Sequence, residues 1–252
     1  MSKWARLTTV PQLKENGCYV WRIKTHAYHP DYEDMLTDEE VQRAQRYHHV
    51  IDRKRFVLGT VLTRVILAKE LNITPRDIPI IRTCPTCGKP HGQPRLPAES
   101  IYWSVSHSGE EVVVAFSRSL RVGVDIEKIQ TDIEDLLVST ILTHEEQEHF
   151  YRAADKTDVF YTYWTRKEAV LKALGTGFSQ SPKSIRFTLA GNRINWSMNE
   201  SKEDLRKVTG QVSDIPVGAH YKAALALLSG VKQDIYLLDA TYLSQITAVK
   251  RH

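Results

Sequence analysis

The order of helix and strand patterns in this 252-residue chain repeats once, with helices before strands each time. In the first half, the capping box Thr37–Glu40 predicts a helix start, because its threonine and glutamate each satisfy a backbone N–H. Apolar residues at helical spacing predict a second helix from Asp52. Strand patterns follow at 101–106 and 112–116, and the turn Ser108–Gly109 between them predicts a hairpin.

A third strand pattern, at 120–127, follows closely where the two halves meet. Beyond it the same order returns, because a second capping box, Thr143–Glu146, opens a helix. A longer helix is predicted with Asp158 as its N-cap and Gly175 as its C-terminal stop. Two strand patterns then return near the end of the chain, at 185–189 and 223–228.

These patterns predict an α+β fold made of two similar halves, residues 1–120 and 121–252. Each half is long enough to bury a modest core. The chain lacks an apolar run of membrane-spanning length and an N-terminal secretory pattern, so we expect a cytoplasmic protein. Its formal charge of +4 fits an anionic partner, but its basic residues are dispersed, which argues against nucleic-acid binding.

The segment 122–127 places two carboxylates on one face of a strand. Because side chains alternate along a strand, Asp125 and Glu127 would share the face opposite three apolar residues, with Gly123 leaving room for a ligand. Two carboxylates repel each other unless a cation lies between them, and their oxygen atoms suit Mg²⁺. Taken alone, the pattern is more typical of an exposed strand face, so the metal interpretation needs a partner motif.

The long helix of the second half carries charged residues beside its apolar stripe. Glu168 and Lys172 lie one turn apart, a spacing that also fits a weak surface ion pair. Lys167 falls inside the stripe, so it must reach solvent or an acidic partner. Glu168 would add a third carboxylate to Asp125 and Glu127 at a metal–diphosphate site, where Lys172 would neutralise phosphate charge.

Three motifs together resemble the 4′-phosphopantetheinyl transferase superfamily. Gly-Val-Asp-Ile-Glu at 123–127 is followed by Trp-Thr-Arg-Lys-Glu-Ala-Val-Leu-Lys at 164–172, and Ser-Val-Ser-His-Ser-Gly at 104–109 is similar to the family's third motif. The chain length resembles the Sfp-type branch, in which one chain holds two similar α+β halves with a single site between them. The resemblance implies a monomer that moves the 4′-phosphopantetheine arm of coenzyme A to a serine of an acyl, polyketide or peptidyl carrier protein, releasing adenosine 3′,5′-bisphosphate.

The resemblance also implies roles for residues of the second half. Asp125, Glu127 and Glu168 would hold Mg²⁺, with Mn²⁺ as an alternative, against the coenzyme A diphosphate. Glu168 and Lys172 would thus act in catalysis, Lys172 by contacting the diphosphate and stabilising charge as its bond breaks. Glu146 matches a family glutamate that acts as general base on the carrier serine. Glu146 also completes a capping box and its neighbour Glu145 is an alternative base, so these assignments stay open.

In the first half, the matching residues would bind the nucleotide. Ser106 and His107 would contact phosphate groups, with His107 near the 3′-phosphate. Arg43 and Arg55 would grip the nucleotide end, and Arg46 is a nearby candidate. The arginines also fit the polar faces of ordinary helices, so both roles stay open.

Two departures from the family pattern affect the same end of the ligand. Glu40 stands where Sfp-type members can carry a nucleotide-binding lysine, and Gln93 replaces a lysine in a Gly-Lys-Pro pattern. We therefore expect the grip on phosphate to be redistributed, either to Lys89 or to the arginines. The resemblance does not fix the 3′-phosphate contacts, the physiological carrier or tolerance of acyl-coenzyme A.

Two further segments carry open alternatives. Residues 129–142, with Ile133, Leu136, Leu137 and Ile141 partly exposed, would form an apolar docking edge for the carrier, although core packing explains the same residues.

Cys84 and Cys87 with His91 would either bind zinc or form a turn with reduced thiols.

The alternative function is another Mg²⁺-dependent phosphoryl-transfer enzyme or a phosphohydrolase, which explains the carboxylates but not the Ser-His-Ser-Gly segment.

Overall fold

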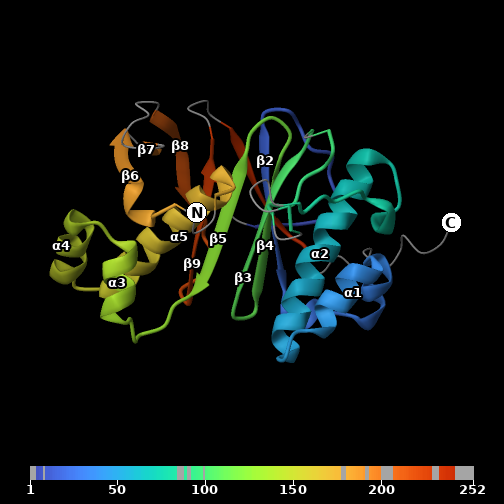
Figure 1. Cartoon of the computed structure of the whole chain (residues 1–252), viewed down its shortest axis with the longest axis horizontal. Coiled ribbons are helices and arrows are strands. Elements are labelled where there is room, and N and C mark those ends of the chain that lie inside the picture. Colours follow the sequence, from blue (N-terminus) through green and yellow to red (C-terminus); the bar gives the residue numbers. More distant parts are fainter. Residues whose placement is uncertain are drawn as a thin grey trace. The chain divides into compact units, whose positions relative to one another are not determined.

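The computed structural model describes most of the chain: residues 4–7, 9–83, 88–89, 92–98, 100–176, 180–190, 193–199, 207–228 and 233–241. The chain divides into two compact units, which we call unit 1 (Met1–Ser119 and Gln233–His252) and unit 2 (Leu120–Lys232). Each unit contains a five-stranded sheet and one long helix packed against it (Figure 1). The predicted α+β class is therefore confirmed.

In unit 1 the sheet has the strand order β1-β10-β2-β4-β3. Its strands are β1 (Ala5–Arg6), β2 (Gly17–Lys24), β3 (Tyr102–Ser108), β4 (Glu111–Ser117) and β10 (Asp234–Asp239). The helices are α1 (Asp38–Gln45) and α2 (Val50–Leu71), with the short helices η1 (Thr25–Ala27), η2 (Pro30–Met35) and η3 (Pro75–Asp77). α2 lies on the sheet and buries Leu58, Leu62 and Ile66 in a core with Trp21 and Phe116.

β10 joins this sheet from the end of the chain. It pairs in parallel with β2, from Asp234 opposite Gly17 to Asp239 opposite Arg22. The two carboxylate–guanidinium bonds from Arg22 to Asp239, at 3.0 and 2.7 Å, hold the end of this pairing. The tail strand thus lies in unit 1, whereas the division drawn from the sequence placed 121–252 together.

In unit 2 the sheet has the order β5-β9-β8-β7-β6, and all neighbours are antiparallel. Its strands are β5 (Val122–Lys128), β6 (Arg186–Ala190), β7 (Arg193–Asn199), β8 (Lys207–Asp214) and β9 (Tyr221–Leu227). The helices are α3 (Asp135–Ile141), α4 (His144–Arg152) and α5 (Lys156–Leu174), with the short helix η5 (Pro182–Ser184). α5 packs along β5 and β9, and α3 and α4 lie beside it (Figure 1).

The local signals placed most helix ends well. Both capping boxes form, and Gly175 ends α5 in the left-handed conformation with φ of 75°. The predicted N-cap of α5 is wrong, because Asp155 caps the helix by accepting the backbone N–H of Asp158 at 2.9 Å. Within the described ranges, no helix is both long and apolar enough to cross a membrane.

Candidate active site

Gly123 brings α5 unusually close to β5. A Cβ atom at this position would lie 1.9 Å from the carbonyl oxygen of Ala169 and 2.4 Å from the backbone nitrogen of Ala173. The expectation that Gly123 leaves room for a ligand is therefore wrong, because the backbone of α5 fills that space. The glycine instead allows the helix that carries the second motif to pack directly on the strand that carries the first.

Asp125 and Lys172 are joined by this close approach. Asp125 lies on the same strand face as Gly123, as the alternation predicts, and is only 2% exposed. Its Oδ1 accepts a hydrogen bond from Lys172 Nζ at 2.7 Å. The helix lysine therefore neutralises the carboxylate of the strand, an ion pair between two motifs that lie far apart in the sequence.

Glu168 lies one turn before Lys172 on α5 and shares this environment. Burial and the negative charge of Asp125 raise the pKa of Glu168 to about 7, and Lys172 opposes the shift. Its Oε1 is buried and has no hydrogen-bond partner among the residues that the structure describes. A buried carboxylate oxygen that lacks a donor, beside a second carboxylate, favours a bound cation.

A divalent cation such as Mg²⁺ fits this donor set, because Asp125 and Glu168 offer hard oxygen ligands on two rigid elements. Glu127 lies two residues beyond Asp125 on the same strand face and is half-buried. Within the described ranges, no three His, Cys, Asp or Glu side chains are grouped closely enough to hold a metal ion. The part of Glu127 as a third ligand stays a prediction.

The raised pKa of Glu168 predicts how the metal-free protein responds to pH. Because the pKa lies above its usual value of 4.5, the folded state binds more protons between pH 4.5 and 7. The free energy of unfolding should therefore fall as pH rises through this window, by about 1–2 kcal/mol once solvent screening is included. Urea unfolding of wild type and Glu168→Gln from pH 5 to 8 checks this, since the variant should lose that part of the slope. If the free energy of unfolding depends on pH in the same way in both proteins, the raised pKa of Glu168 is contradicted.

Glu146 is buried in an ion pair. Its Oε2 accepts the backbone N–H of Thr143 at 2.8 Å and Lys167 Nζ at 2.5 Å, and Lys167 also donates to the carbonyl of Ile141 at 2.9 Å. Burial lowers the pKa of Lys167, while Glu146 favours its charged form. The capping role of Glu146 is confirmed, its role as a base stays a prediction, and Glu145 is exposed.

In unit 1, the predicted phosphate-binding residues lie on opposite faces of β3. Ser106 is 7% exposed, while the adjacent His107 is exposed on the face that carries Val105 toward α2. Arg55 Nε donates to the carbonyl of Gly109 at 2.7 Å, which ties α2 to the hairpin turn after these residues. Arg55 also binds Asp52 at 2.7 Å, so its guanidinium is partly engaged.

Arg43 and Arg82 form a second basic group in unit 1. Arg43 is exposed on α1 and its guanidinium lies 5.1 Å from the centre of the Phe56 ring. Burial lowers the pKa of Arg82, and the nearby charge of Arg43 lowers it further. Two guanidinium groups that repel each other are suited to an anion. Sequence reasoning missed Arg82, because no local pattern distinguishes it from other loop arginines.

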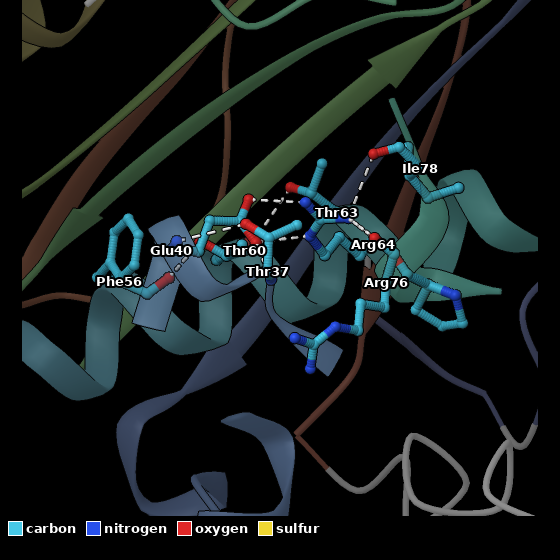
Figure 2. Close-up of polar contacts among 10 residues, drawn as sticks. Thr37, Glu40, Phe56, Thr60, Thr63, Arg64, Arg76 and Ile78 are labelled. Atoms are coloured by element: carbon cyan, nitrogen blue, oxygen red, sulfur yellow. Dashed lines mark hydrogen bonds and ion pairs between the residues drawn. The ribbon is translucent and has the colours of Figure 1, made fainter. Parts of the chain in front are cut away.

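Glu40 is not available as a ligand-facing residue. Its carboxylate is buried against Arg64, whose Nε and Nη2 donate to it at 2.7 and 3.0 Å (Figure 2). Arg64 also donates to the carbonyls of Pro75 at 2.7 Å and Arg76 at 3.2 Å. The departure from the family lysine at position 40 thus has a structural explanation: the glutamate joins α1 and η3 to α2.

The remaining predicted segments have mixed outcomes. Leu136 is 74% exposed on α3, whereas Ile141 is 3% exposed and belongs to a core cluster with Phe150 and Phe160, so its expected exposure is wrong. Ile133 and Leu137 are half-buried against the same cluster. Gln93 and Lys89 are exposed. The predicted zinc ligands Cys84, Cys87 and His91 lie outside the described residues.

Comparison with known proteins assigns the chain to a family. Residues 121–226 match the model of the 4′-phosphopantetheinyl transferase superfamily, and residues 21–119 match the model described as 4′-phosphopantetheinyl transferase, N-terminal. The matches correspond to the two halves and leave out only residue 120 between positions 21 and 226. The chain therefore belongs to the 4′-phosphopantetheinyl transferase superfamily.

Curated relatives agree with this assignment. The 4′-phosphopantetheinyl transferase HetI of a Nostoc species is 29% identical over 67% of this chain and 73% of its own length. The 4′-phosphopantetheinyl transferase Sfp of Bacillus subtilis is 27% identical over 66% of this chain and 72% of its own length. A Synechocystis relative is 31% identical over 60% of this chain, which spans 61% of that relative's length. The predicted Sfp-type resemblance, with both halves in one chain, is confirmed.

Proposed function

We propose that this chain transfers the 4′-phosphopantetheine arm of coenzyme A to a serine of an apo acyl, polyketide or peptidyl carrier protein. In this reaction the serine oxygen attacks the diphosphate phosphorus that bears the arm, and a new phosphoester bond forms. The bond to the nucleotide breaks, adenosine 3′,5′-bisphosphate leaves with the electron pair, and the serine proton passes to a base. The observation that carries the proposal is the group of the buried Asp125 and the partly buried Glu168 and Lys172, built from both family motifs.

Each residue of this group has a separate task. Asp125 and Glu168 would hold Mg²⁺, with Glu127 as a third ligand, and the ion when bound would neutralise the negative charge of the diphosphate. Lys172 Nζ lies 2.7 Å from Asp125 Oδ1. This ion pair would hold the ammonium in place where the anionic phosphate oxygens approach. A fixed cation needs little reorganisation as charge develops on the leaving phosphate.

The basic residues of unit 1 would bind the nucleotide end of coenzyme A. Arg43, Arg82 and the exposed His107 supply the cationic and hydrogen-bonding groups that phosphate oxygens need. Arg55 and the buried Ser106 would contribute at the hairpin turn. The family pattern further supports a monomer, because one chain supplies both halves. We also propose a cytoplasmic location.

An exposed leucine on α3 tests the proposed carrier-docking edge. Leu136→Asp should raise the KM for the carrier by about tenfold, because a carboxylate would replace an apolar contact and repel an acidic partner. The KM for coenzyme A should stay unchanged. Steady-state kinetics with each substrate varied in turn measures both values. Leu189→Asp is the matched control, since Leu189 is similarly exposed, at 79%, on β6. Equal changes in both KM values, or in both variants, would contradict docking at α3.

Coenzyme A without a carrier distinguishes transfer from hydrolysis. A phosphohydrolase would cleave coenzyme A with Mg²⁺ alone, using water as the acceptor. The proposed transferase should leave it intact over the same time and consume it only when an apo carrier is added. Chromatography of the nucleotide products follows both reactions. Carrier-independent cleavage would support the alternative function.

A further inference from the structure

The two units contain the same buried ion pair at the same place in their folds. In unit 1, Glu40 follows the N-cap Thr37 of α1 and pairs with Arg64 of the long helix α2 (Figure 2). In unit 2, Glu146 follows the N-cap Thr143 of α4 and pairs with Lys167 of the long helix α5. Both glutamates are 8% exposed, and the basic partners are 2% and 0% exposed.

The atomic contacts are repeated as well. Each glutamate accepts the backbone N–H of its N-cap threonine through Oε2, which also accepts the basic side chain at 2.7 Å in unit 1 and 2.5 Å in unit 2. Each basic side chain also donates to a backbone carbonyl, that of Pro75 in unit 1 and that of Ile141 in unit 2. The pair therefore joins a short helix and a neighbouring segment to the long helix in both units.

This repeat bears on the role of Glu146. Unit 1 builds the arrangement without the Asp125–Glu168 group, so the arrangement serves the fold independently of that group. A general base must come within about 2.6–3.2 Å of the hydroxyl it deprotonates. Glu146 is 8% exposed, and its Oε2 already accepts the ammonium of Lys167 and the backbone N–H of Thr143, so the carboxylate has little room to reach the hydroxyl of a carrier serine.

Lys167 connects the pair to the active-site group through the backbone of α5. It directly precedes Glu168, and its ammonium is anchored to α3 through Ile141 and to α4 through Glu146. We propose that Glu146 and Lys167 are positioning residues that fix the Glu168 turn of α5, and that another group takes the proton of the carrier serine. The kinetic part of this inference rests on the proposed function.

Paired substitutions test the positioning role. Glu146→Gln and Lys167→Met should each lower Tm, because each leaves one buried polar group without its partner. The double variant E146Q/K167M should recover part of both the Tm and the turnover, since it removes both charges. A base cannot be recovered in this way: if Glu146 is the base, E146Q and the double variant lose turnover equally, by roughly 10²–10⁴-fold. That equal loss would overturn the proposal.

Mg²⁺ binding separates positioning from a general loss of stability. Mg²⁺ should raise the Tm of the wild-type protein, and the measured quantity is the Mg²⁺ concentration that gives half of this increase. E146Q and K167M should each raise that concentration about tenfold. The matched variants Glu40→Gln and Arg64→Met should lower Tm comparably and leave that concentration unchanged. Equal Mg²⁺ responses in both sets would overturn the proposal. The measurement needs no carrier protein, so a wild-type protein that fails to transfer the arm would refute the proposed function without affecting this result. The exposed Glu145→Gln is the control for charge on α4.

Discussion

Asp125→Asn and Glu168→Gln are each expected to lower the turnover of arm transfer by on the order of 10²–10³-fold. Each substitution keeps the shape of the side chain but removes a carboxylate that would bind the metal ion beside Lys172. The Mg²⁺ concentration that gives half of the maximal rate should rise in both variants, because the remaining carboxylate binds the ion more weakly. Initial rates measured over a range of Mg²⁺ concentrations with a fixed apo carrier provide the test.

The control is a carboxylate that is exposed and outside this group. Glu15→Gln makes the same chemical change in the turn before β2, where the side chain is exposed, and should leave the rate within about twofold. Circular dichroism checks that all three variants are folded. Wild-type turnover in Asp125→Asn or Glu168→Gln would refute the assignment of these residues to the metal.

Gly123→Ala is expected to destabilise the protein by at least about 3 kcal/mol, or to prevent folding. The added methyl group would lie 1.9 Å from the Ala169 carbonyl, and both atoms belong to rigid backbone elements. Relief requires moving α5 away from β5, which would also separate Lys172 from Asp125. Thermal and urea unfolding measure the loss of stability.

Gly59→Ala is the matched control for this loss. At Gly59 in α2, the nearest atom to an added Cβ is a methyl carbon of Val105 at 3.0 Å, which can shift. Alanine also favours a helix by about 1 kcal/mol over glycine, so the net change should be small. Similar stability in the Gly123 and Gly59 variants would show that β5 and α5 are not in rigid contact.

Local sequence signals predicted those parts of the fold whose causes are local. Thr37 and Thr143 cap helices because the residues that complete each box lie three positions away. Gly175 ends α5 because its left-handed conformation is inexpensive for glycine. The placement of β10 had no local signal, since its partner β2 lies more than 200 residues earlier in the chain.

The candidate site shows the same limit: the features set by local sequence were predicted, and the contacts between distant elements were not. Alternation along β5 placed Asp125 on the face of Gly123, but which element covers that face depends on tertiary packing, so the purpose of Gly123 was misjudged. Lys167 was recognised as a buried cation in need of an acidic partner, yet its spacing alone could not identify Glu146. The long-range pairs of each unit required the structure.

The most direct test of the central claim is the mass of a carrier protein before and after incubation with this chain, coenzyme A and Mg²⁺. The account predicts that an apo acyl, polyketide or peptidyl carrier gains the mass of one phosphopantetheine arm, with release of one equivalent of adenosine 3′,5′-bisphosphate. A carrier whose acceptor serine is replaced by alanine should gain nothing, and chelation of Mg²⁺ should stop the reaction. An unchanged mass for carriers of all three classes, with coenzyme A intact, would contradict the account.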